Sequence, residues 1–304
     1  MTDYRAHFDA SVRFANGGGL EANGFRLDLP SDALDEAEIG RLFVRHLGLA
    51  LVGEARLTNL RIVEEQHRGS RGIVAETPDT VGGRRRVIDL SHRIRAGLVT
   101  YPGLPSPVIT PHLTRADSRD RYAPGTEFAM DIITLVGNTG TYLDSPFHRY
   151  ADGGDLASLD LGTLVGLPAN VFHITDALDR GIPAEVFADR AVAGSAVLLH
   201  TGWDEHFGTP AYATGAPFLT EAGARHLVDA GVALVGIDSL NIDDTETASG
   251  GARPAHTLLL AAGIHVVEHL TGLGAVPAHG ARFTAVPPAI EGFGTFPVRA
   301  FAEV

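Results

Sequence analysis

Residues Gly137–His148 read GNTGTYLDSPFH, and this stretch decides how the rest of the chain is interpreted. It follows the apolar run MDIITLV at residues 130–136, whose β-branched content predicts a buried strand. The glycines after the run predict a turn, and Asp144 and His148 follow that turn closely. A turn at the end of a strand can present a carboxylate and an imidazole to one cavity. The alternative is an ordinary loop, in which Asp144 caps a turn and His148 lies on the surface.

Composition limits the classes of protein to consider. The chain has 304 residues, 44% of them hydrophobic, which is enough for one large domain or two smaller ones. Its formal net charge of -13 argues against a general binder of nucleic acid or of anionic membranes, since either would need a basic face. There are no cysteines, so disulfides, thiolate metal sites and cysteine nucleophiles are excluded.

The N-terminal sequence, MTDYRAHFDASVRF, lacks the basic start and apolar stretch of a signal peptide. No uncharged apolar run reaches the ~20 residues that a membrane helix needs. We therefore expect a soluble cytoplasmic protein that acts on a small molecule and has neither a nucleic-acid nor a membrane partner.

The sequence pattern predicts that residues 1–80 form a small β-β-α-β module and that residues 81–304 form the catalytic domain. Ser31 is the expected N-cap of the helix in the module, and residues 66–83 are polar and glycine-rich, as in a linker. The module has no cluster of titratable groups suited to catalysis. We expect it either to help form a homo-oligomer, a dimer or tetramer, or to close over the pocket.

The C-terminal half alternates strands and helices, which predicts an α/β sheet with at least some parallel strands. The expected strands cover residues 196–200, 232–237 and 264–268, and the expected helices cover 220–230 and 254–262. His256 begins the second helix, while Asp238 and Glu268 each end a strand. All three positions belong to the carboxyl edge of the sheet, where ligands bind in open α/β folds.

His256 and Glu268 are therefore expected to converge with Asp144 and His148. Two carboxylates with one or two imidazoles can hold zinc or manganese. The same groups can instead form a metal-free acid–base pair.

One short motif gives a different prediction. Residues 265–269 read HVVEH, which matches the H-x-x-E-H motif of inverted zinc proteases. That motif needs a helix to bring both histidines onto one face, whereas residues 264–267 are typical of a strand. We therefore interpret His265 and His269 as structural or surface residues.

Taken together, residues 87–304 resemble the cyclase family that includes bacterial kynurenine formamidase and isatin hydrolase. The segments that carry the resemblance are Ile88–Ser91, Tyr101–Gly103, Thr201–Asp204, Gly236–Ser239, His256 with Glu268, and Pro297–Arg299. The family's signature is H-x-G-T-H-x-D-x-P-x-H, and this chain has NTGTYLDSPFH from Asn138 to His148. The first 80 residues lie outside the resemblance.

The resemblance implies a swivelling β/β/α fold, here with an appended α+β module, and a metal-dependent hydrolase of amides or lactams. It implies that Asp144, His256 and Glu268 are metal ligands and that His148 is the catalytic acid–base. Both leading histidines of the signature are replaced, by Asn138 and Tyr142. Because an amide oxygen and a neutral phenol are poor zinc ligands, we expect the first of the family's two metal positions to be lost or badly weakened.

Three functions remain open. The first is a hydrolase of a small amide, lactam or lactone with a reduced, mononuclear zinc or manganese site. The second is a metal-independent cyclase, dehydratase or lactonase that uses His148, Asp144 and Tyr142. The third is a non-catalytic binding protein, which the retention of two carboxylates near two imidazoles argues against, because burying such groups is costly. The residues expected to contact the substrate are Tyr101, Asn138, Phe147 and Trp203.

Overall fold

The computed structural model describes residues 2–14, 19–29, 31–47, 49, 52–66, 86–177 and 179–304. The chain divides into two compact units. The first comprises Met1–Gly82, Arg95–Gly97 and Pro105–Leu135, and the second comprises Gly83–Ile94, Leu98–Leu104 and Val136–Val304. Most of the expected linker at residues 66–83 lies outside the described residues. Residues 105–135, which the sequence analysis placed in the catalytic domain, cluster with the N-terminal unit.

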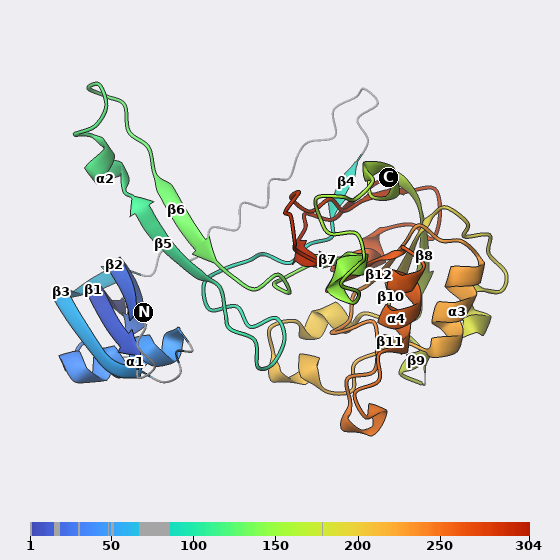
Figure 1. Cartoon of the computed structure of the whole chain (residues 1–304), viewed down its shortest axis with the longest axis horizontal. Helices are drawn as coiled ribbons and strands as arrows, with labels where there is room; N and C mark the ends of the chain where they lie inside the picture. The colour runs from blue at the N-terminus through green and yellow to red at the C-terminus, as the bar shows by residue number, and fades with distance from the viewer. Residues whose placement is uncertain are drawn as a thin grey trace. The chain divides into compact units, whose positions relative to one another are not determined.

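The N-terminal unit contains the predicted β-β-α-β order (Figure 1). Strands β1 (Thr2–Phe14), β2 (Gly19–Leu29) and β3 (Val52–Gln66) form an antiparallel sheet in the order β2-β1-β3. Helix α1 (Glu36–His46) covers it and buries Phe43 against Phe8 and Phe25. The expected N-cap was wrong, because Asp35 and not Ser31 accepts the hydrogen bond from Glu38 N–H. Asp35 and Glu38 form a reciprocal capping box that starts the helix later.

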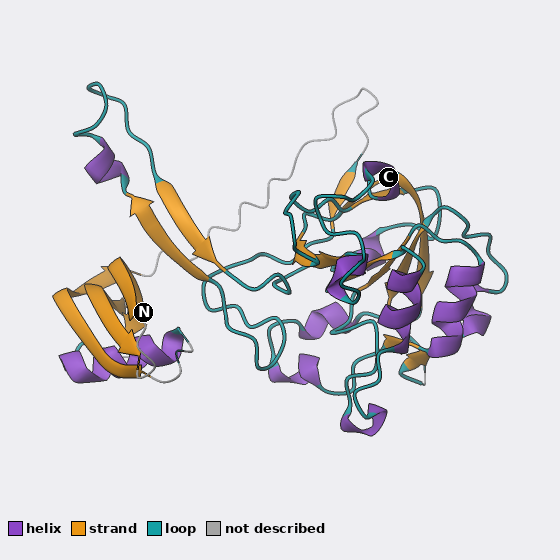
Figure 2. Cartoon of the chain, viewed as in Figure 1, coloured by secondary structure: helices purple, strands orange, loops and turns teal. Residues whose placement is uncertain are grey.

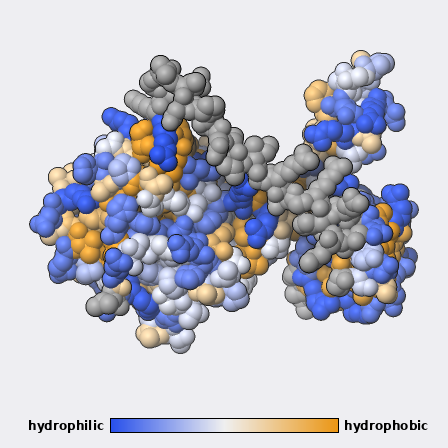
Figure 3. Space-filling model, turned by 180° about the vertical axis from the view of Figure 1, so that it is seen from behind, coloured by the Kyte–Doolittle hydropathy of each residue, from blue (hydrophilic) through white to orange (hydrophobic). Residues whose placement is uncertain are grey.

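The same unit includes a hairpin of β5 (Val108–Leu113) and β6 (Met130–Thr134), with the short helix α2 (Arg115–Ser118) between them. The strand at residues 130–134 was predicted, but its burial was wrong: every residue of β6 is exposed, including Ile132 and Ile133 at 49% and 51%. A β-branched run favours a strand whether or not a second layer covers it. Around α2 the tip of the hairpin is mainly hydrophilic (Figure 3).

The second unit is built on a nine-stranded mixed sheet with the order β15-β7-β13-β12-β10-β8-β14-β16-β4. Its centre is parallel, as predicted from the alternation of strands and helices, and the outer strands are antiparallel. The parallel strands are β8 (Leu167–His173), β10 (Ala196–His200), β12 (Leu234–Ile237) and β13 (His265–Glu268). The others are β4 (Val87–Asp89), β7 (Tyr142–Asp144), β14 (Arg282–Thr284), β15 (Thr295–Pro297) and β16 (Phe301–Glu303). A separate pair consists of β9 (Gly181–Ile182) and β11 (Phe218–Leu219).

Both faces of the central strands are buried, which explains their continuous apolar sequences. Along β10, Leu198 joins the core on one face, while Val197 and Leu199 join the core on the other. Helices α3 (Glu221–Asp229) and α4 (Pro254–Ala261) pack on the second face (Figures 1 and 2). The site described below lies on this helix-covered face.

Local sequence sets the ends of these helices, close to the positions predicted. The Thr220 hydroxyl accepts a hydrogen bond from Gly223 N–H at the start of α3, and Gly231 follows its end with a positive φ of 69°. Pro254 opens α4 and Gly263, with a φ of 73°, follows it. None of the helices in the described part of the chain is long and apolar enough to span a bilayer. The observed α/β architecture with an appended α+β module is the predicted fold class.

Candidate functional site

The register of three neighbouring strands gathers the polar residues of the site. Glu268 on β13 lies opposite Tyr142 on β7, and Asp144 on β7 lies opposite Thr295 on β15. Tyr142 and Asp144 are two residues apart on one strand and so share a face. Directly opposed residues of antiparallel strands also share a face, so the four side chains converge. Asp144, which was expected to follow a turn closely, is the last residue of a short strand and is fully buried, so the alternative of an ordinary loop with Asp144 as a turn cap is wrong.

His148 is held by a hydrogen-bond relay to Asp144. It closes a short 3-10 helix, Pro146–His148, and its side chain is 36% exposed. The Thr295 hydroxyl donates to Asp144 Oδ1 and lies 2.7 Å from His148 Nδ1. Because a hydroxyl has one proton, Thr295 can only accept from His148 Nδ1–H in this arrangement. The relay therefore selects the tautomer of the neutral ring that carries its proton on Nδ1, the one in which Nε2 can act as a general base.

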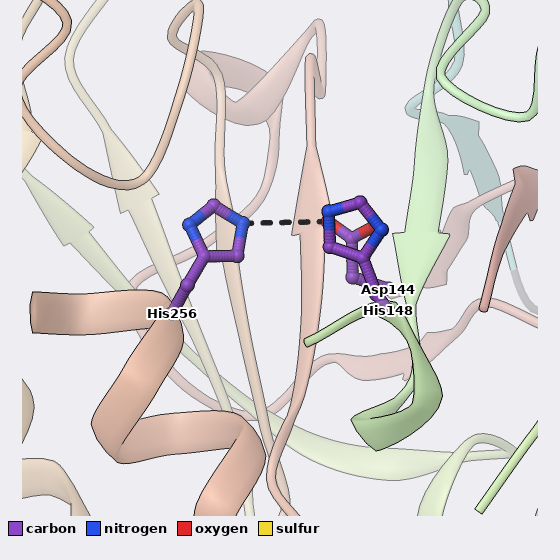
Figure 4. Close-up of side chains that lie close together, drawn as sticks. All are labelled: Asp144, His148 and His256. Carbon is purple, nitrogen blue, oxygen red and sulfur yellow. Dashed lines mark ion pairs between the residues drawn. The ribbon is translucent and has the colours of Figure 1, made fainter. Parts of the chain in front are cut away.

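His256 enters the site from the first turn of α4, facing Asp144 and His148 (Figure 4). Asp243 fixes its orientation: one oxygen lies 2.7 Å from His256 Nδ1, and the two oxygens accept from Ala255 and His256 N–H. His256 Nε2 is then directed toward the carboxylates, 3.5 Å from Asp144 Oδ2 and 3.6 Å from Glu268 Oε1. Burial alone would lower the pKa of His256, but Asp144 and Asp243 raise it to about 10.

Glu268 ends β13 and is 1% exposed. Its Oε1 accepts from Ile242 N–H at 2.6 Å, and its Oε2 accepts from the Tyr142 hydroxyl at 2.6 Å. Burial raises the pKa of Glu268 to about 7, against the opposing attraction of His256. For Asp144, burial also acts to raise the pKa, but His256 and His148 outweigh it and the pKa lies below its ordinary value.

These residues fit one divalent metal ion. Asp144 Oδ2 is buried and has no hydrogen-bond partner closer than 3.5 Å, and His256 Nε2 faces it from 3.5 Å; a bound cation would take the place of the proton on that nitrogen. Donor atoms of Asp144, His148 and His256 all lie within 4.8 Å of one another. A histidine whose other nitrogen is tied to a carboxylate, as His256 is to Asp243, is the usual form of a metal-ligating histidine. Glu268 lies outside this group of three, although its Oε1 is 3.6 Å from His256 Nε2, so the ligand set expected from the resemblance is only partly reproduced and His148 takes the third place.

Tyr142 occupies the place where the family signature has a second histidine. Its hydroxyl donates to Glu268, and burial with the neighbouring carboxylates raises its pKa well above the ordinary value. The hydroxyl also lies 3.3 Å from His269 Nε2, and His269 Nδ1 lies 2.8 Å from the Tyr212 hydroxyl. A buried chain of hydrogen bonds therefore holds the phenol in its neutral form. Neither Tyr142 nor Asn138 offers the nitrogen ligand that a second metal position would need.

Members of the cluster, by which we mean the site residues Tyr142, Asp144, His148, His256, Glu268 and Thr295, line two cavities. One, of about 450 Å³, is lined by Asn138, Tyr142, His148, Arg149, Asn241, Gly251, Ala252, Arg253, His256 and Glu268. The other, of about 330 Å³, includes Asn138, Phe147, His148 and Thr295. The structure thus places Asn138 and Phe147 beside the cluster. Tyr101 and Trp203 line neither cavity and pack instead around Tyr212 and Leu240.

Other expected positions have structural roles. Asp238 accepts hydrogen bonds from Thr201 and Gly202 and so fixes the loop after β10, and it lines neither cavity. His265 is buried at the start of β13, a strand, so the inverted zinc-protease motif is excluded as predicted. His269 is buried directly behind Tyr142.

Sequence reasoning missed four contributors: Thr295, Asp243, Arg149 and Arg253. Thr295 lies 151 residues from Asp144 and reaches it only through the pairing of β15 with β7, so no local pattern could reveal it. For Asp243 the sequence contains a weak indication of a role in the site, because this residue follows the end of β12 by a few residues, at the carboxyl edge of the sheet. The arginines are considered below.

The comparisons with known proteins agree with this architecture. Residues 88–244 match the family model described as "Putative cyclase". A kynurenine formamidase of Geobacillus thermodenitrificans is 31% identical over 215 residues, which cover 70% of this chain and 95% of that protein.

Two solved structures match at the level of fold and sequence. An isatin hydrolase bound to the product analogue thioisatinate has a TM-score of 0.61 and 25% identity, covering 72% of this chain and 92% of its own. A protein described as a potential metal-dependent hydrolase with cyclase activity has a TM-score of 0.58 and 26% identity, covering 72% and 98%. These matches confirm the resemblance inferred from the signature. The chain belongs to the cyclase family of enzymes.

Proposed function

We propose that the protein hydrolyses a C–N bond in a small amide or lactam, with a lactone as the related oxygen substrate. The observation that carries the proposal is the orphaned oxygen of Asp144 facing His256 Nε2, beside a cavity that also contains His148. The names of the relatives, a kynurenine formamidase and an isatin hydrolase, support a substrate of this chemical class.

Asp144, His256 and Glu268 would hold a single zinc or manganese ion. When bound, such an ion would polarise the scissile carbonyl and lower the pKa of a water molecule toward ~7. Asp243 orients His256, and Ile242 N–H orients Glu268, so both ligand atoms are fixed before any ion binds.

His148 is the proton carrier in this proposal. Its Nδ1–H is engaged by Thr295, so Nε2 can take a proton from the attacking water and return it to the leaving nitrogen. Asp144 stabilises the imidazolium that forms, through Thr295 and from 3.7 Å. The Tyr142 hydroxyl, which donates to Glu268, keeps that carboxylate turned toward His256.

A metal-independent reaction is the second candidate, and the position of Tyr142 favours it. The phenol already donates to Glu268, and His256 lies between Asp144 and Glu268 as an ion-pair partner to both. In that case His148 would act as the base, and the Tyr142 hydroxyl would turn its one proton from Glu268 to the substrate carbonyl during cyclisation, dehydration or ring opening, while Glu268 keeps its bond from Ile242 N–H.

Metal content separates the two candidates. The purified protein is washed with chelator, analysed for metal per chain, and assayed on amides, lactams and lactones before and after addition of zinc or manganese. About one ion per chain, with activity that falls on chelation and returns on readdition, supports the metal-assisted hydrolase. Activity that survives complete removal of metal would contradict it and support the second candidate.

His148→Gln tests for a binding protein without catalysis. Loss of a general acid–base costs about 10²–10⁴-fold in rate, so kcat should fall by that factor while metal content stays the same. His279→Gln, at an exposed histidine that lines neither cavity, is the control and should leave kcat unchanged. An unchanged rate in His148→Gln would remove it as the proton carrier.

A further inference from the structure

Two arginines line the same 450 Å³ cavity as Tyr142, His148, His256 and Glu268. Arg149 directly follows His148, and Arg253 is the N-cap residue of α4, three positions before His256. The chain as a whole is acidic, with a net charge of -13, so two guanidinium groups at the reactive cavity are unexpected on composition alone. Neither is needed for the proton relay or the proposed metal ligands.

Arg253 has no carboxylate partner among the described residues. Its Nη1 donates to the backbone carbonyls of Asp244 and Ala252, at 3.0 and 2.8 Å. The nearby Asp244 carboxylate is already bound by both terminal nitrogens of Arg180, at 3.1 to 3.2 Å. The two carbonyls therefore hold the guanidinium in place without neutralising it, while its Nη2 and Nε have no hydrogen-bond partner in the described part of the chain.

Arg149 is likewise unpaired with any acid in the residues that the structure describes. It is exposed, and its guanidinium carbon lies 5.5 Å from the centre of the Tyr150 ring. The Tyr150 hydroxyl in turn donates to the Thr257 carbonyl of α4, so the ring beneath Arg149 is fixed to the helix that carries Arg253. An aromatic platform restricts an arginine without removing its capacity to bind an anion.

We propose that Arg149 and Arg253 form an anion subsite that binds a carboxylate group on the substrate. The proposal rests on the proposed function, because it places the scissile C–N bond at His148 and His256 and the carboxylate at the two arginines that line the same cavity. The substrate class is then an N-acyl acid, or a lactam that carries a carboxylate, rather than a neutral amide.

A carboxylate fits the charge of the cavity better than a dianion does. Glu268 lines the cavity, and Asp144 lies 3.5 Å from His256, which also lines it, so additional negative charge brings repulsion. Planar guanidinium groups match the geometry of a carboxylate through paired N–H donors, and such pairs are stronger than neutral hydrogen bonds.

Binding can be measured without assuming any reaction. Calorimetric titrations at low ionic strength compare benzoate with benzamide, and inorganic phosphate serves as a second anion. Arg149→Gln and Arg253→Gln should each weaken benzoate binding by roughly tenfold, while benzamide binding stays the same in all proteins. Arg225→Gln, at an exposed arginine that pairs with Glu221 on α3, is the matched control and should behave as wild type.

The kinetic test uses an N-acyl amino acid and its methyl ester. We expect the acid to have the higher kcat/KM, and each pocket variant to raise KM for the acid alone. If the acid and its methyl ester are hydrolysed with the same kcat/KM, the anion subsite is wrong but the proposed hydrolase activity is supported. If neither compound reacts, the calorimetric titrations decide. Loss of benzoate binding in Arg149→Gln and Arg253→Gln supports the subsite. The carboxylate assignment is overturned if all variants bind benzoate equally, or if phosphate binds more tightly than benzoate and depends on the arginines.

Discussion

At the scale of single residues, the replacement of two signature histidines by Asn138 and Tyr142 distinguishes this site. The Tyr142 hydroxyl, held by His269, donates to Glu268 where the family resemblance places a metal. We predict that the double variant Asn138→His/Tyr142→His gains a second ion, because two imidazole ligands then join Asp144 and Glu268.

Elemental analysis after dialysis against zinc or manganese measures this gain. The stoichiometry should rise from about one ion per chain toward about two, and each single variant, which supplies one imidazole, should show a weaker gain. If the folded double variant still binds the same number of ions per chain, the prediction is wrong, and the neighbouring His269 and Tyr212 would then be the residues that keep a second ion from binding.

His265 gives a residue-scale prediction about pH. It is 5% exposed, and burial lowers its pKa from 6.5 to about 4. The unfolded chain therefore binds this proton more readily, so the stabilising contribution of neutral His265 is complete above pH 6.5 and is lost as the pH falls toward 4. The shift corresponds to a loss on the order of 3 kcal/mol.

Chemical denaturation of wild type and His265→Gln between pH 7.5 and 4 checks the expectation. Part of the acid-induced loss of unfolding free energy should disappear in the variant, whose Gln retains a hydrogen-bonding group for Thr163. Parallel curves for the two proteins over the whole pH range would show that His265 does not contribute.

At the scale of elements, the position of the Pro146–His148 turn depends on two glycines. A Cβ on Gly294 would lie 2.5 Å from the backbone nitrogen of His148, and one on Gly153 would lie 2.6 Å from the carbonyl carbon of Pro146. The backbone at Gly294 and at Gly153 therefore packs closely against this short 3-10 helix, and this packing holds His148 next to Thr295. Gly294→Ala must displace the turn, because backbone atoms cannot move aside as a flexible side chain can.

We predict that Gly294→Ala lowers kcat at least tenfold while the chain remains folded, because a general base out of place by about 1 Å loses much of its effect. Circular dichroism and the rate on any substrate found measure the two quantities. Gly40→Ala is the control, since its Cβ would meet nothing within 4 Å, and it should leave the rate unchanged. Full activity in Gly294→Ala would show that the turn tolerates displacement.

The same elements show what the sequence could and could not predict. His256 and Glu268 were located because helix and strand periodicity fixed α4 and β13, and parallel topology fixed which ends they share. The partnership of Thr295 with Asp144 depends on strand order, which no local pattern encodes. The burial of β6 was predicted wrongly because side-chain type in a strand does not reveal whether another layer covers it.

At the scale of the whole molecule, the exposed hairpin supports the expected homo-oligomer, which remains a proposal. Ile109, Met130, Ile132 and Ile133 are between 44% and 51% exposed on its two strands. Because side chains alternate along a strand and Ile109 lies opposite Ile133, these two share one face of the hairpin, and Met130 and Ile132 share the other. Exposed apolar side chains of this kind mark association surfaces in soluble proteins, and a second copy of this chain is the partner that we propose.

Ile132→Thr/Ile133→Thr removes apolar area while keeping residues that favour strands. Light scattering after size-exclusion chromatography should show a multiple of the chain mass for wild type and a shift toward the single-chain mass for the double variant. Val165→Thr, at a site 50% exposed in the second unit, is the matched control and should leave the mass unchanged. If the wild type already elutes as one chain, or if the double variant keeps the wild-type oligomer, self-association through this hairpin is wrong.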